Sequence, residues 1–128
     1  MPLVRDVMRA ELVTVAPSTT VIDAARKMFA RGVGSALVVE AETMEGIFTE
    51  RDILRSLAGV ADSGRGSPVS RWMTPRPVTI APEATVGQAL DVMLNGGFRH
   101  LPVMDGKNVL GVVSLRDVMG ARIGRAVR

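Results

Sequence analysis

Apolar positions in this chain follow an alternation of short β-type runs and helical stripes. Residues 12–15 form a run rich in Val and Leu, and from Thr20 onward apolar residues recur at the three- and four-residue spacing of an amphipathic helix. We expect this helix to bury one stripe, made of Val21, Ala24, Ala25, Met28 and Phe29. Residues 36–39 and 46–48 then read as two strands, and a second helix, capped by Thr49, carries Ile53, Leu54 and Leu57.

The same order of elements returns in the second half of the chain, at an offset of 65 residues. Strand-type runs lie at 78–80, 101–104 and 110–113, and a helix begins at Ser114. The helix after Pro82 is expected to point a second stripe inward, made of Val86, Ala89, Leu90, Met93 and Leu94. A short segment precedes each repeat, at 4–8 and 69–73, and is predicted to form one helical turn.

This duplication predicts an α/β protein of two repeats, one at 1–57 and one at 69–128, joined by a linker at 58–68 that is rich in small and turn-forming residues. A lone repeat of about sixty residues is marginally stable. We therefore expect one compact tandem module, with the repeats packed around a pseudo-twofold axis. Two related clefts would lie where the repeats meet.

Composition narrows the possible functions. The chain has 128 residues, a formal charge of +3, no Cys and one His, so thiolate metal sites and thiol catalysis are excluded. No apolar run reaches the length of a membrane span and no signal peptide is evident, so a cytoplasmic location without membrane contact is expected. Arg far outnumbers Lys, which favours anionic ligands, while the scarcity of aromatic residues makes nucleic acid an unlikely partner.

Two nonapeptides carry the most specific signal. Residues 46–54 read GIFTERDIL and residues 111–119 read GVVSLRDVM, each at a strand-to-helix boundary. With residues 99–105 and the Met that ends each short segment, they resemble the tandem cystathionine-β-synthase (CBS) domain family, here as a free-standing pair. The resemblance implies two βαββα repeats with small mixed sheets and helices.

The motif has a ligand-binding and a structural interpretation. A helix N-terminus offers unpaired N–H groups to a phosphate beside Thr49 or Ser114, and Asp52 or Asp117 can accept both hydroxyls of a ribose. The same residues also form a capping-box arrangement, which stabilises a helix without any ligand. The resemblance favours the first interpretation and implies AMP, ADP, ATP or another adenosyl compound such as S-adenosylmethionine as the ligand, with no other cofactor.

The resemblance also assigns residues to two unequal clefts. One cleft would combine Ser114, Asp117, Val112, Arg99 and His100 with Thr14, Gly34, Ser35 and Ala36. The other would combine Thr49, Asp52 and Ile47 with Thr79 and the backbone around residues 98–101. Only the first has Arg99 and His100, so we expect the cleft with Asp117 to bind phosphorylated ligands more tightly.

Three functions compete. The preferred one is a regulatory adenine-nucleotide sensor that controls an unknown effector protein through ligand-dependent conformation. The alternative is a structural or dimerisation pair with no physiological ligand, and the resemblance makes a homodimer the expected assembly in either case. An enzyme is the weakest interpretation, because the sequence shows no nucleophile with a base and no metal cluster.

Overall fold

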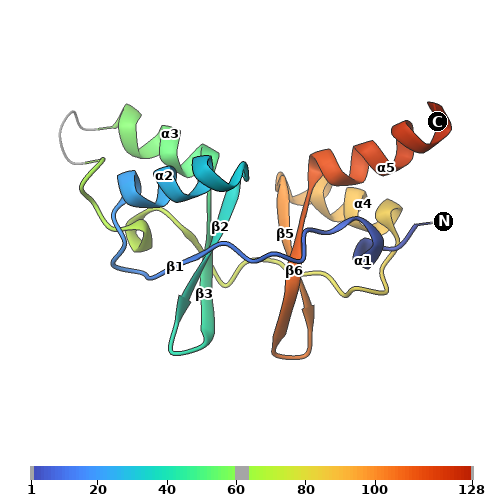
Figure 1. Ribbon diagram of the computed structural model, residues 1–128, viewed down its shortest axis with the longest axis horizontal. Coiled ribbons are helices and arrows are strands. Elements are labelled where there is room, and N and C mark those ends of the chain that lie inside the picture. The colour runs from blue at the N-terminus through green and yellow to red at the C-terminus, as the bar shows by residue number, and fades with distance from the viewer. Residues whose placement is uncertain (1, 60–63, 128) are drawn as a thin grey trace. The chain divides into compact units, whose positions relative to one another are not determined.

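The computed structural model describes residues 2–59 and 64–127, and it divides into two compact units. The first-repeat unit is Val13–Pro77, and the second-repeat unit combines Met1–Leu12 with Val78–Arg128. Figure 1 shows that each unit has helices on a small β-sheet, which confirms the predicted α/β class. Of the predicted linker, residues 60–63 lie outside the described residues.

The first-repeat unit is a mixed four-stranded sheet with two α-helices, in the order β1-β2-β3-β4. Strand β1 is parallel to β2, and the pairs β2–β3 and β3–β4 are antiparallel. Its elements are β1 (Thr14–Val15), α2 (Val21–Arg31), β2 (Ser35–Glu40), β3 (Thr43–Thr49), α3 (Glu50–Ala58), the 3-10 turn η1 (Val69–Arg71) and β4 (Thr74–Pro75).

The second-repeat unit has the corresponding order, with α4 and α5 beside the antiparallel hairpin β5–β6. Single bridges from Ile80 to Val103 and from Arg9 to Val112 take the places of β1 and β4. Its elements are α1 (Val4–Val7), α4 (Val86–Gly96), β5 (His100–Asp105), β6 (Asn108–Ser114) and α5 (Leu115–Val127). The strands predicted at 46–48 and 110–113 are confirmed and begin earlier, at Thr43 and Asn108.

The short segment that precedes each repeat belongs to the unit of the other repeat. Val4 is fully buried in the second-repeat unit, where its N–H donates to the carbonyl of Ala84 at 2.7 Å. Val69 is buried in the first-repeat unit, where its N–H donates to the carbonyl of Thr19 at 2.8 Å. The predicted helical turns are confirmed as α1 and η1, and each completes a core assembled from distant parts of the chain.

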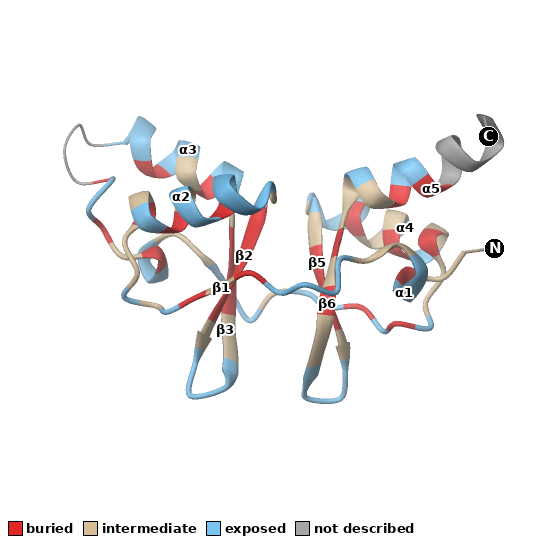
Figure 2. Cartoon of the chain, viewed as in Figure 1, coloured by how far each residue is buried: buried red, intermediate tan, exposed pale blue. Residues whose placement is uncertain are grey.

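Each unit has an apolar core between its helices and its sheet (Figure 2). The expected stripes are confirmed at Val21, Ala24 and Met28 on α2 and at Val86, Ala89 and Met93 on α4. The prediction was wrong at the ends of both stripes, since Phe29 is 90% and Leu94 is 68% exposed. A residue next to Met28 or Met93 lies about 100° around the helix from it, which turns that side chain away from the sheet.

Gly111 is required where the N-terminal segment crosses β6. The N–H of Arg9 donates to the carbonyl of Val112 at 2.9 Å, and the N–H of Val112 donates back at 3.0 Å. A Cβ at Gly111 would lie 2.4 Å from the carbonyl oxygen of Arg9. Gly46 occupies the same place against β4, with a Cβ 2.6 Å from the carbonyl oxygen of Thr74.

Replacing Gly111 with Ala should therefore destabilise the protein. We expect Gly111→Ala to lower the free energy of unfolding by about 1–3 kcal/mol, since overpacking pushes the backbone of Arg9 away from β6. The control is Gly120→Ala in α5, where an added Cβ meets nothing within 4 Å. That change should be neutral or stabilising by up to about 1 kcal/mol. Urea unfolding measures both, and equal effects would contradict the close approach.

Candidate ligand site at two helix N-termini

In each unit a strand of the hairpin runs directly into a helix, and an acid one turn along caps that helix. The N–H of Thr49 donates to Oδ2 of Asp52 at 2.9 Å, and the N–H of Ser114 donates to Oδ2 of Asp117 at 3.0 Å. Both acids therefore cap their helix through the same backbone hydrogen bond, as the capping-box interpretation expects. One carboxylate oxygen of each acid is used in this way.

The second carboxylate oxygen differs between the repeats, beginning with Asp52. This residue is only 4% exposed, and its Oδ1 accepts a hydrogen bond from a guanidinium nitrogen of Arg55 at 2.9 Å. The hydroxyl of Thr49 also donates to Oδ2, at 3.2 Å. Both oxygens of Asp52 are therefore engaged by neighbours on the same helix.

Asp117 is half-buried and has a simpler environment. The N–H of Asp117 donates to the hydroxyl oxygen of Ser114 at 3.1 Å, completing a reciprocal cap. Within the part of the chain that the structure describes, Oδ1 of Asp117 accepts no hydrogen bond, and the Ser114 hydroxyl donates none. One acceptor and one donor thus remain at the start of α5.

The starts of β2 and β5 lie beside these caps. Ser35 pairs with Thr49 across the first hairpin, and the N–H of Glu50 donates to the carbonyl of Gly34 at 3.1 Å. His100 pairs with Ser114 across the second hairpin, and the N–H of Leu115 donates to the carbonyl of Arg99 at 2.7 Å. Each unit therefore brings its own strand start to its own helix.

The predicted site residues divide between the units. The first-repeat unit holds Thr14, Gly34, Ser35, Ala36, Ile47, Thr49 and Asp52, and the second-repeat unit holds Thr79, Arg99, His100, Val112, Ser114 and Asp117. Ala36 and Ile47 are buried strand residues, and Thr79 is exposed ahead of the bridge at Ile80. Both predicted clefts combine residues of the two units and stay predictions.

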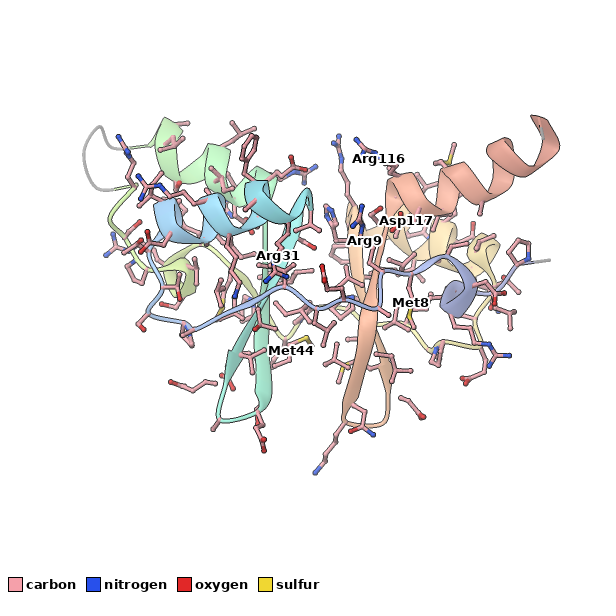
Figure 3. All side chains as sticks on the ribbon, in the orientation of Figure 1. Met8, Arg9, Arg31, Met44, Arg116 and Asp117 are labelled. Carbon is pink, nitrogen blue, oxygen red and sulfur yellow. The ribbon has the colours of Figure 1, made fainter. Side chains whose placement is uncertain are left out.

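Arg9 is a candidate that the sequence analysis missed. Arg9 forms two backbone hydrogen bonds with Val112, which lies two residues before Ser114 on β6. The side chain of Arg9 is exposed. Figure 3 labels Arg9, Arg116 and Asp117 around the start of α5. The sequence contained one signal that could have identified Arg9, because the offset of 65 aligns it with Thr74 and so places it at the equivalent position before the other repeat.

The charges around the two caps therefore differ. Three exposed arginines, Arg9, Arg99 and Arg116, belong to the backbone segments that meet at the start of α5. The first-repeat cap combines Asp52 with Glu50, Arg51 and Arg55, two acids and two bases. The second-repeat cap is the more cationic of the two.

No group of three His, Cys, Asp or Glu side chains among the described residues could hold a metal ion. The helices in the described part of the chain are too short or too polar to span a membrane.

Both repeats match a known domain family. The family model of the CBS domain matches residues 4–59 and 69–124. The CBS domain-containing protein YhcV of Bacillus subtilis is 33% identical over 118 residues, covering 92% of this chain and 84% of that protein.

Solved structures of this family have the same fold. The CBS-domain containing protein from Agrobacterium tumefaciens superposes with a TM-score of 0.89 at 34% identity, covering 94% of this chain and 99% of that one. The structure of CBSX2 in complex with AMP has a TM-score of 0.81 at 26% identity, covering 97% of this chain and 98% of that one. The similarity in each case extends over both repeats.

The unequal carboxylates should be distinguishable by stability. We expect Asp52→Asn to lower the free energy of unfolding by about 1 kcal/mol more than Asp117→Asn, because the amide nitrogen would face the Arg55 guanidinium as a second donor. Arg55 is 55% exposed, and solvent screening keeps the difference at this modest level. Urea denaturation of the two variants measures it, and equal losses would show that the Arg55 contact contributes nothing.

Proposed function

We propose that this protein, which belongs to the CBS-domain family and carries two CBS domains in tandem, is a regulatory module that binds an adenine nucleotide at the start of α5. The Asp117 oxygen that accepts no hydrogen bond in the described part of the chain carries this proposal, since it can bind a ribose hydroxyl while the other oxygen still caps the helix. The module acts by binding rather than catalysis. The AMP complex of CBSX2 supports an adenosyl ligand.

The surroundings of Asp117 suit the phosphate end of such a ligand. The first turn of α5 presents N–H groups with a partial positive charge, and the Ser114 hydroxyl has a hydrogen to donate. A cation about 4 Å from a phosphate contributes about 4 kcal/mol at an effective dielectric of about 20, before desolvation. Three arginines in this region therefore favour a phosphorylated adenosine over adenosine itself.

The ligand would signal through its differential affinity for two conformations of the protein. A nucleotide that binds one conformation more tightly shifts the population toward it, and an effector protein that recognises this conformation receives the signal. The complete caps in both units favour the structural alternative, a CBS pair without a physiological ligand. Binding measurements separate the two functions.

Asp117→Asn tests the proposed site directly. We expect this change to weaken AMP binding more than tenfold in isothermal titration calorimetry, because hydrogen bonds to charged groups contribute about 1.5–3 kcal/mol. The unfolding midpoint should change little, since the amide oxygen can still cap α5. ADP, ATP, S-adenosylmethionine and NADH titrated in parallel identify the preferred ligand.

The control for this variant is Asp105→Asn, which removes the same charge from the exposed end of β5. It should bind AMP like the wild type. A wild-type protein that binds none of these ligands, or an Asp117→Asn variant that loses stability and binding together, would favour the structural function.

The proposed assembly is a homodimer through the exposed helix faces. Phe29 on α2 and Leu94 on α4 are related by the offset of 65, as are Leu54 on α3 (68% exposed) and Met119 on α5 (38% exposed). Exposed apolar residues grouped on helix faces mark interaction sites. A surface that occurs twice in one chain is suited to a second copy of the same chain, because each patch then meets a like patch.

Charged substitutions on these faces should break the dimer. We expect Phe29→Glu and Leu94→Glu each to shift the protein from dimer toward monomer in sedimentation velocity, because burying an unpaired carboxylate at an interface is unfavourable. Asn95→Glu adds the same charge at the neighbouring exposed position of α4 and is the matched control. A wild-type monomer, or a Leu94→Glu variant as dimeric as the control, would contradict this assembly.

A further inference from the structure

We propose that Arg55 closes the first-repeat site and thereby restricts nucleotide binding to the second repeat. This inference rests on the proposed function and identifies the residue that makes the two duplicated sites unequal. Its basis is the ion pair between Arg55 and Asp52, at 2.9 Å.

Arg55 takes the position that a ribose would need. With Oδ2 of Asp52 used by the N–H and the hydroxyl of Thr49, only Oδ1 could accept a hydrogen bond from a sugar. The guanidinium of Arg55 already donates to that oxygen, and because Asp52 is only 4% exposed, little room is left for a second donor from a ligand. To bind there, a ribose hydroxyl would have to displace the guanidinium. This exchange is unfavourable because the hydroxyl is a neutral donor, and charge-assisted hydrogen bonds are the stronger ones.

Arg55 also contacts Trp72, through its guanidinium plane and through the nitrogen that contacts Asp52. Its guanidinium carbon lies 5.8 Å from the centre of the Trp72 ring, within cation–π range, and its nitrogen lies 3.4 Å from the Trp72 carbonyl oxygen. The indole N–H donates to the hydroxyl oxygen of Ser67 at 2.8 Å, and this hydroxyl donates to the carbonyl of Gly64 at 2.6 Å. A connected set of contacts therefore holds the closing side chain over Asp52.

The second repeat lacks both parts of this arrangement. At the offset of 65, Gly120 stands in place of Arg55, and Val7 stands in place of Trp72. Gly120 has no side chain to reach Asp117, and Val7 offers no aromatic ring or indole donor. This difference accounts for the Asp117 oxygen that accepts no hydrogen bond among the described residues.

Arg55→Met tests the closure, since it keeps an apolar stem beside Trp72 and removes the charged donor. Calorimetry with AMP, and with adenosine because this cap has no excess positive charge, should give one binding event per chain for wild type and two for Arg55→Met. Adding Asp52→Asn to that variant should remove the second event. Trp72 is the only Trp of the chain, so its fluorescence should respond to ligand in Arg55→Met and not in wild type.

The reciprocal variant Gly120→Arg places the same cation three residues after Asp117. We expect it to weaken AMP binding by about tenfold or more, and Gly120→Ala, which adds no charge, to bind like wild type. Circular dichroism confirms that each variant is folded before titration.

The outcomes separate this inference from the function on which it rests. Wild-type protein that binds no adenosyl ligand would overturn the proposed function. A single binding event in wild type that stays single in Arg55→Met, together with unchanged affinity in Gly120→Arg, would overturn the role of Arg55 and leave the proposed function standing. Two equal events in wild type would also overturn the closure.

Discussion

A carboxylate one turn into a helix has two oxygens, and capping the helix needs only one of them. Asp52 and Asp117 both use Oδ2 for the cap and thereby fix the strand-to-helix turn on which each unit is built. The remaining oxygen is therefore available for another role at no cost to the helix. In one repeat it holds Arg55, and in the other it is open within the described part of the chain.

The N-terminal segment of each repeat belongs to the unit of the other repeat, and this exchange is the second constraint on the fold. Strand β3 pairs with β4, which precedes the second repeat, and β6 pairs with Arg9, which precedes the first repeat. Gly46 and Gly111 allow these close approaches. Neither repeat of the sequence contains a whole core, because Val4 and Val69 are buried in the unit of the other repeat. The duplicated sequence therefore folds as two units that depend on both halves of the chain.

Much of this could be predicted from the sequence. The period of the apolar residues located the helices and strands, the offset of 65 located the repeats, and the two nonapeptides indicated the family that the comparisons bear out. The exposure of Phe29 and Leu94 could not be predicted, since an apolar residue at the edge of a stripe looks the same whether it faces a core or another surface. The place of Arg9 was missed because its pairing with Val112 joins residues far apart in the chain.

The spacing of Asp52 and Arg55 was visible in the sequence, but the closure by Arg55 was not predicted. An Arg three residues after an Asp on a helix is common and is usually a weak surface pair. What makes this pair different is the burial of Asp52 and the contact of Arg55 with Trp72, which lies beyond the linker in the sequence. At the offset of 65, three residues around the first cap have different counterparts around the second. These residues are Thr74, Gly34 and Arg55, and their counterparts are Arg9, Arg99 and Gly120. Two of these differences add an arginine to the segments around Asp117, and the third leaves Asp117 without a counterpart of Arg55. A duplicated scaffold can thus give one helix N-terminus a purely structural role while the other keeps the charge and the open acceptor that an anionic sugar requires.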